Sequence, residues 1–226
     1  KNGAEVIKLM ASGGAGGVTE RLSDCQLTVE ELTAATEEAH KKGKTVAVHA
    51  TGPASILNAL NSGADTIEHG VIVDDESVAK FVETDALYVP TLEIYNRIAT
   101  YASAQYPPHY PARAREAVQY HRESFQKALS GGVRIGAGTD SGNHRWFLGD
   151  LALEHQLMVE YGMDPLQAIL TATRTAAAAM NLDHEIGTLE QGKAADVVVV
   201  NGNPLDQISA LRQIASVMKN GQMLPV

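Results

Sequence analysis

The chain has 226 residues, of which 44% are hydrophobic, and a formal net charge of −9 at pH 7. This length can bury a sizeable core in one domain or somewhat more, whereas the acidic balance argues against a nucleic-acid partner, because phosphate binding needs a basic surface. No apolar run approaches the roughly 20 residues that cross a bilayer, so no membrane partner is expected, and the single cysteine, Cys25, excludes an internal disulfide.

Apolar runs of strand length alternate with segments of helical periodicity along most of the chain. The pattern predicts strands at residues 5–10, 45–49, 66–69, 87–92 and 133–139. It predicts helices at residues 28–42, 53–61, 74–83, 112–130, 151–161 and 165–180. Thr28 with Glu31 forms the pattern of a capping box, and residues 95–111 form an insertion with four tyrosines and three prolines.

Five strand–helix units in succession imply a parallel sheet with helical crossovers. An open doubly wound sheet and part of an eight-stranded (β/α)8 barrel of the TIM type both fit. In a barrel, five of the eight strands are present and three precede Lys1. After Asn181 the pattern becomes β-rich, with a strand near 197–200 and a hairpin at 215–223 whose turn is Asn220-Gly221. This tail predicts a second, small sheet.

Four metal-capable side chains, Lys8, His49, His69 and Asp140, each end a short apolar run that lies in, or directly before, the carboxyl-terminal part of a predicted strand. The carboxyl ends of parallel strands meet at one edge of a sheet, where α/β proteins place their sites. Imidazole and carboxylate groups are ligands for zinc-class metals. Each residue also has an ordinary interpretation: a single histidine can be structural, and the Asp140 carboxylate can cap a helix or form an Asx turn.

Lys8 lies between apolar neighbours, where burying an uncompensated ammonium is costly. The side chain can simply point outward or extend its ammonium to solvent. It can be a Schiff-base nucleophile of lowered pKa. Third, it can react with carbon dioxide to form a carbamate, an anionic ligand able to bridge two metals. The histidines and the aspartate favour the carbamate.

Other residues are candidates for contacts with a substrate. Tyr95 can donate a hydrogen bond to a carbonyl oxygen that gains negative charge, although packing within the tyrosine-rich insertion explains it equally well. His144 and Arg145 follow Asp140 closely and can face the same pocket, with Arg145 meeting a substrate carboxylate. Surface exposure accounts for both as well. The glycine-rich run 12–18 lacks the Gly-Lys-Ser/Thr ending of a phosphate loop and favours an active-site loop instead.

At these residues the sequence resembles the metal-dependent amidohydrolase superfamily, in its imidazolonepropionase-like and Xaa-Pro dipeptidase-like branch. The ordered series of motifs covers essentially the whole chain and comprises Ile7-Lys8, Val48-His49-Ala50-Thr51-Gly52, Glu68-His69-Gly70, Val89-Pro90-Thr91-Leu92, Gly138-Thr139-Asp140 and the turn 187–196. The resemblance implies that residues 1–183 form part of a (β/α)8 barrel, namely its last five strands, and that residues 184–226 return to a small composite β-sandwich.

The resemblance also implies roles for individual residues. Lys8 matches a carboxylated lysine that bridges two divalent metals, expected to be zinc, while His49 and His69 match ligands to one of them. Asp140 matches a ligand and general base, and Tyr95 a tyrosine that polarises the substrate. The implied reaction is hydrolysis of an amide or peptide-like carbon–nitrogen bond by metal-activated hydroxide, with a small molecule or dipeptide as substrate.

The chain departs from the family pattern because it contains no His-x-His pair, which the family carries on its first barrel strand. We therefore expect a fragment of a longer protein, whose activity on its own is doubtful. Three alternatives stay open: a mononuclear deaminase-like site of His49, His69 and Asp140 with Lys8 unmodified, a Schiff-base aldolase, and an inactive remnant. The sequence is compatible with a homo-oligomer.

Overall fold

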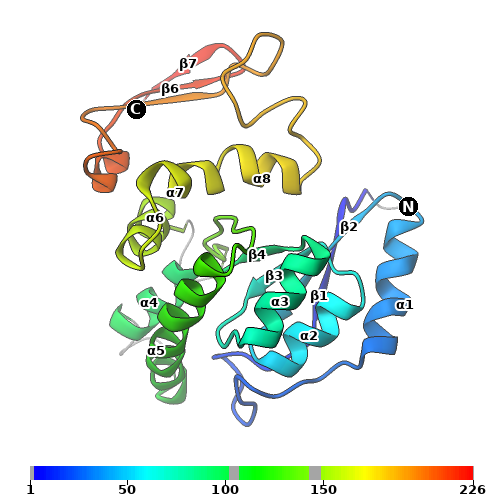
Figure 1. Cartoon of the computed structure of the whole chain (residues 1–226). Helices are drawn as coiled ribbons and strands as arrows, with labels where there is room; N and C mark the ends of the chain where they lie inside the picture. The colour runs from blue at the N-terminus through cyan, green and yellow to red at the C-terminus, as the bar shows by residue number, and fades with distance from the viewer. Residues whose placement is uncertain (1–2, 102–106, 143–148, 226) are drawn as a thin grey trace.

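The computed structural model describes residues 3–101, 107–142 and 149–225. Its centre is a parallel sheet whose strands lie side by side in chain order, each followed by helical crossover segments (Figure 1). The strands are β1 (Val6–Met10), β2 (Thr45–Ala50), β3 (Thr66–His69) and β4 (Leu87–Val89). All four strands were predicted, and their parallel order confirms an α/β fold.

The helices follow the predicted pattern with three differences. They are α1 (Val29–His40), α2 (Pro53–Asn61), α3 (Asp75–Thr84), α4 (Leu92–Tyr101), α5 (His109–Ser130), α6 (Leu151–Glu160), α7 (Pro165–Thr171) and α8 (Arg174–Ala179). The predicted capping box at Thr28 is present. Helix α4 was not predicted, α5 begins three residues earlier than expected, and the single helix expected at 165–180 is divided at Thr173, whose backbone is not helical.

The fifth predicted strand is reduced to one isolated bridge, between Ile135 and Tyr88 of β4. Tyr88 donates its amide hydrogen to Arg134 and accepts one from Gly136, both at 2.9 Å. A side chain at Gly136 would meet Leu87 at 2.7 Å, so the glycine permits this close approach. The segment 133–139 therefore lies beside β4 but forms no extended ladder.

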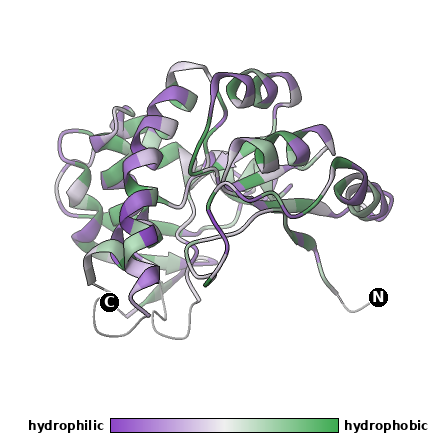
Figure 2. Ribbon diagram, turned by 90° about the horizontal axis from the view of Figure 1, so that it is seen from below, coloured by the Kyte–Doolittle hydropathy of each residue, from purple (hydrophilic) through white to green (hydrophobic). Residues whose placement is uncertain are grey.

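One face of the sheet is covered by helices and the other is largely open. Val46, Val48 and Ile67 are fully buried beneath the helices, whereas Val6 and Met10 on β1 remain 50% and 52% exposed. Lys8 lies on the same exposed face of β1. Figure 2 shows the strands mostly hydrophobic and the helices mixed in hydropathy, as expected of helices that pack one side on a sheet. None of the described helices is long and apolar enough to span a membrane.

The tail forms a separate antiparallel sheet of β5 (Val197–Val200), β6 (Ile214–Lys219) and β7 (Gln222–Leu224). The predicted hairpin is confirmed, because Asn220 and Gly221 have φ angles of 49° and 76° between β6 and β7, as a type I′ turn requires. A 3-10 helix, η1 (Ile208–Arg212), precedes β6 and packs against α6. The tail is thereby attached to the helices that follow Asp140.

Replacement of Tyr88 by phenylalanine tests the packing at the edge of the sheet. The Tyr88 hydroxyl is buried and donates to the Gly70 carbonyl at 2.9 Å. Tyr88→Phe leaves that carbonyl unpaired and is expected to lower the free energy of unfolding by about 1–2 kcal/mol in urea denaturation. The matched control, Tyr120→Phe, changes a tyrosine that is 42% exposed and is expected to leave stability within about 0.5 kcal/mol. Equal effects in the two variants would contradict this packing.

Candidate metal and active site

A pocket of about 450 Å³ opens at the carboxyl ends of the strands. Five residues singled out from the sequence line it: Lys8, His49, His69, Tyr95 and Asp140. They come from β1, β2, β3, α4 and the segment after the Ile135 bridge, so the fold brings together side chains that are far apart in sequence. His144 and Arg145, the other two candidates, lie outside the described residues.

The two histidine rings lie side by side, with centroids 4.5 Å apart and their planes at 68°. This contact is not what regular strand alternation gives. In the register of β2 and β3, His49 is opposite Glu68 and His69 is opposite Ala50, so a regular strand would direct His69 to the other face. His69 instead has a φ of 75°, a conformation that is rare for residues other than glycine. The change of backbone direction turns its ring towards His49.

Contacts on both sides fix the orientation of His69. Its Nδ1 atom lies 2.7 Å from the Thr91 hydroxyl, and its backbone carbonyl accepts a hydrogen bond from His121 Nε2 at 2.7 Å. The contact at Nδ1 makes Nε2 the nitrogen through which His69 can bind a ligand. A hydrogen bond to the opposite ring nitrogen is the arrangement that orients metal-binding histidines.

Burial keeps both imidazoles neutral. It lowers the pKa of His49, and it lowers the pKa of His69 well below its usual value, with further lowering by the neighbouring His49 and Lys8. His49 and His69 are only 7% and 6% exposed. A neutral imidazole is the form that binds a metal. The pair therefore needs no deprotonation to act as ligands at neutral pH.

The carboxyl groups of Glu68 and Asp140 both interact electrostatically with Lys8. Desolvation lowers the pKa of Lys8, while attraction to Glu68 and Asp140 opposes that shift. Burial raises the pKa of both carboxyl groups, against the attraction of Lys8. Glu68 was not singled out from the sequence, although strand alternation and pairing with His49 place it on the Lys8 side of the sheet. A lysine of lowered pKa is nucleophilic, as carbamate formation and Schiff-base formation both require.

Tyr95 is 4% exposed, and its ring stands edge-on to His69 at 5.8 Å and to His121 at 5.3 Å. Burial, followed by the charge of Asp140, raises the pKa of its phenol. The hydroxyl thus stays protonated and can donate a hydrogen bond at any physiological pH. The residue lies on α4 and not in an irregular insertion, so the prediction of the surrounding loop was wrong.

The glycine-rich segment after β1 forms one wall of the pocket. His49 Nε2 lies 3.2 Å from the Gly13 carbonyl, and a side chain at Gly14 would approach the His49 ring at 3.3 Å. Arg113 of α5 donates hydrogen bonds to the carbonyls of Gly17 and Val18. A small residue is therefore favoured at Gly14, where the glycine-rich segment crosses His49. Arg113 attaches the same segment to α5.

His121 and Glu154 are buried polar residues that the sequence did not identify. His121 was not singled out from the sequence, yet it is 0% exposed and bonded to the His69 carbonyl. Glu154 is 0% exposed on α6 and accepts backbone hydrogen bonds from the start of α4. Helical periodicity places His121 with the buried Ala114, Ala117 and Phe125, which is the signal that would have identified its burial.

The donor set fits a divalent metal in part. Two neutral, oriented imidazoles converge on the pocket that Lys8 and Asp140 also line. Within residues 3–101, 107–142 and 149–225, however, no three His, Cys, Asp or Glu side chains are close enough together to hold a metal ion. The described residues thus supply a pair of candidate metal ligands with further candidates nearby, which agrees with the absence of a His-x-His pair in the sequence.

The family model that describes the amidohydrolase family matches residues 1–224. The chain belongs to the amidohydrolase family. An ochratoxinase from Aspergillus niger is 32% identical over 228 residues, covering 99% of this chain and 47% of the relative. An imidazolonepropionase from Symbiobacterium thermophilum is 29% identical over 211 residues, covering 87% of this chain and 44% of the relative. The resemblance stated from the motifs is confirmed.

Among solved amidohydrolase structures, a Xaa-Pro dipeptidase with methionine bound in its active site aligns with a TM-score of 0.91. It is 33% identical to this chain, and the alignment covers 99% of this chain and 55% of the dipeptidase. The chain thus spans about half the length of the amidohydrolases that it matches.

The buried carboxyl of Glu154 is expected to make stability depend on pH. Burial raises its pKa to about 8 from an ordinary value of 4.5. Between these values the folded protein holds a proton that the unfolded chain has released, so the free energy of unfolding falls as pH rises from about 5 to 8. In urea denaturation across this range, Glu154→Gln should flatten the slope, whereas Glu160→Gln, at an exposed position of the same helix, should not. An unchanged slope in Glu154→Gln would contradict the assignment.

Proposed function

We propose that the complete protein is a metal-dependent hydrolase of an amide or peptide-like carbon–nitrogen bond in a small molecule. The observation that carries this proposal is the pair of buried, neutral imidazoles, His49 and His69, in one pocket with Lys8, Tyr95 and Asp140. Membership of the amidohydrolase family supports it. An isolated structural histidine would need none of these neighbours.

The proposal includes the completion of the fold. The parallel sheet, with the bridged segment at Ile135, is taken as five strands of a (β/α)8 barrel within residues 1–183. Residues 184–226 contribute return strands to a composite β-sandwich. The open face of β1 and the coverage of about half of the Xaa-Pro dipeptidase structure support this arrangement.

Two divalent metals, zinc by the chemistry of the donors, would be held by this site together with ligands from the rest of the protein. His49 and His69 would bind one metal, Asp140 would add a carboxylate, and Lys8 would bridge both as a carbamate formed with carbon dioxide. Such metals, when bound, polarise the scissile carbonyl and lower the pKa of water towards 7. The neutral histidines and the lowered pKa of Lys8 support these assignments.

The chain's own residues would then move the proton and stabilise the charge. A carboxylate oxygen of Asp140 accepts a proton from the attacking water as the new carbon–oxygen bond forms. The same oxygen delivers that proton to the leaving nitrogen as the carbon–nitrogen bond breaks. Tyr95 donates its hydroxyl hydrogen to the carbonyl oxygen as negative charge develops there, and its raised pKa keeps that hydrogen in place.

The substrate is proposed to be a dipeptide or a related amide of an amino acid. The pocket wall combines apolar Ile94 and Ile98 with the polar residues of the site, which suits a substrate with both an apolar side chain and charged ends. The related dipeptidase structure with bound methionine supports an amino acid at this position. Arg145 and His144 are proposed to meet the substrate carboxylate.

Asp140→Asn tests the proton-transfer role. In the complete protein this change is expected to lower kcat for methionyl-proline by about 10³-fold or more, because asparagine cannot accept the proton. Metal content, measured by inductively coupled plasma mass spectrometry, is expected to differ from that of the parent protein by less than about a third. Asp206→Asn, at an exposed turn, serves as the control. Near-parent activity in Asp140→Asn would remove this residue from proton transfer.

Metal stoichiometry tests the role of Lys8. A carbamate bridge predicts about two metals per complete chain and about one in Lys8→Ala, whose activity short carboxylates such as formate partly restore. A single metal in the parent protein, together with unchanged metal content in Lys8→Ala, would instead favour the mononuclear deaminase-like site. Lys44→Ala is the matched control, since Lys44 stands before β2 and away from the pocket.

A further inference from the structure

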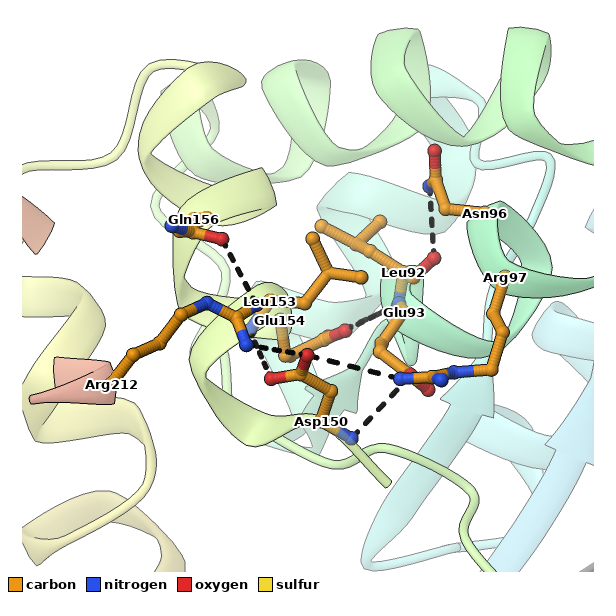
Figure 3. A network of polar contacts seen from close by, with 9 residues as sticks. All are labelled: Leu92, Glu93, Asn96, Arg97, Asp150, Leu153, Glu154, Gln156 and Arg212. Atoms are coloured by element: carbon orange, nitrogen blue, oxygen red, sulfur yellow. Dashed lines mark hydrogen bonds and ion pairs between the residues drawn. The ribbon is translucent and has the colours of Figure 1, made fainter. Parts of the chain in front are cut away.

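The first turn of α4 is held by a carboxyl group from another helix. Glu154 of α6 is fully buried, and its Oε1 and Oε2 atoms accept the backbone hydrogens of Leu92 at 3.1 Å and Glu93 at 2.6 Å. Figure 3 shows the Glu154 side chain directed at the start of α4. The first turn of a helix leaves its backbone donors without partners inside the helix, so Glu154 satisfies two of them from a distant part of the chain.

Four other helices are capped by the side chain of the residue directly before them. The side chains of Thr28, Asp74, Asp150 and Asp164, each directly before a helix, accept hydrogen bonds from the first turns of α1, α3, α6 and α7. Short polar side chains at this position are the usual caps. A buried glutamate is a costlier solution, because burial penalises its charged form.

Thr91, the residue before α4, is of the right type for a local cap but has a different contact. Its hydroxyl lies 2.7 Å from His69 Nδ1, and its φ of 53° is far from the extended backbone of a usual capping residue. A positive φ is strained for a β-branched side chain. The hydroxyl that would cap α4 thus orients His69, and Glu154 supplies the cap in its place.

We propose that Glu154 is a positioning residue: by capping α4 from α6, it leaves the Thr91 hydroxyl for His69 and fixes Tyr95 one turn further along against the same histidine. The inference rests on the proposed function of this site, in which His69 and Tyr95 act. Tyr95 follows the capped residues Leu92 and Glu93 closely, and its ring lies 5.8 Å from that of His69.

Ion pairs at the start of α6 hold this cap in place. Arg97 of α4 pairs with Glu93 one turn earlier and lies 3.8 Å from Asp150, the cap of α6. Asp150 also accepts a hydrogen bond from Arg212 of η1 at 2.7 Å. Figure 3 shows these groups around Asp150, between α4 and the tail. The start of α4 is therefore attached to the start of α6 and, through Arg212, to η1 in the tail.

Glu154→Gln in the complete, metal-loaded protein tests the proposal. Even in the protonated form expected below pH 8, both carboxyl oxygens of Glu154 can accept a hydrogen bond, whereas the NH2 group of glutamine accepts none. The first turn of α4 therefore loses part of its cap in Glu154→Gln. We expect kcat for methionyl-proline to fall about 10- to 100-fold, as for a small displacement of a reacting group, while KM changes less than about threefold. Glu160→Gln, on the exposed side of the same helix, is the control and should match the parent.

A second readout does not depend on turnover. In protein labelled with 3-fluorotyrosine, the ¹⁹F resonance of Tyr95, assigned by its absence in Tyr95→Phe, should shift or broaden in Glu154→Gln and not in Glu160→Gln. A shifted resonance in a protein whose parent hydrolyses no dipeptide would support the positioning role and contradict the proposed function. If Glu154→Gln does not fold, Glu154→Asp, which keeps the carboxyl group but shortens its reach, takes its place.

A double-variant cycle separates positioning from simple stabilisation. If Glu154 acts through Tyr95, the fold-loss in kcat from Glu154→Gln is smaller in a Tyr95→Phe background than in the parent protein. An equal fold-loss in both backgrounds would overturn the proposal. A lowered melting temperature with an unchanged Tyr95 resonance and a kcat within about twofold of the parent would overturn it too, because Glu154 would then only stabilise the fold.

Discussion

The left-handed backbone at His69 is the constraint on which the rest of the site depends. Regular strand geometry would turn its ring away from His49, yet a φ of 75° brings the two rings to 4.5 Å. Such a conformation persists only where the surroundings over-determine it. Here the Thr91 hydroxyl holds Nδ1 and His121 holds the carbonyl. Thr91 and Asp140 also have positive φ angles, of 53° and 50°. Strained backbone is therefore found at His69, Thr91 and Asp140, of which His69 and Asp140 line the pocket.

Much of the fold and the position of the site could be predicted from the sequence. The period of the apolar residues identified β1 to β4, and the order of the strands followed from the helical segments between them. Once the strands are parallel, residues at their carboxyl ends must meet at one edge. Lys8, His49, His69 and Asp140 could therefore be grouped from the sequence, and all four line one pocket, although Lys8 lies two residues before the end of β1.

The remaining features depend on contacts between distant segments, which local patterns do not contain. Only Pro90 and Thr91 separate β4 from helix α4. The cap of α4 comes from Glu154, which lies 61 to 62 positions later in the chain. His121 could not be recognised from the sequence as a support of the site, because its partner is the backbone of His69, 52 positions away. The glycines that let residues 133–139 approach β4 also weakened that segment as a strand, and only the Ile135 bridge remains.

In the proposed site, His49 and His69 bind one metal ion between them, and Lys8 links it to a second. Anomalous diffraction from crystals of the zinc-loaded complete protein, recorded on both sides of the zinc absorption edge, tests this directly. We expect one peak about 2.0–2.1 Å from His69 Nε2 and from a ring nitrogen of His49, and a second peak joined to it by density that extends from Lys8 Nζ. Full zinc occupancy elsewhere, with no peak between the two histidines, would contradict it.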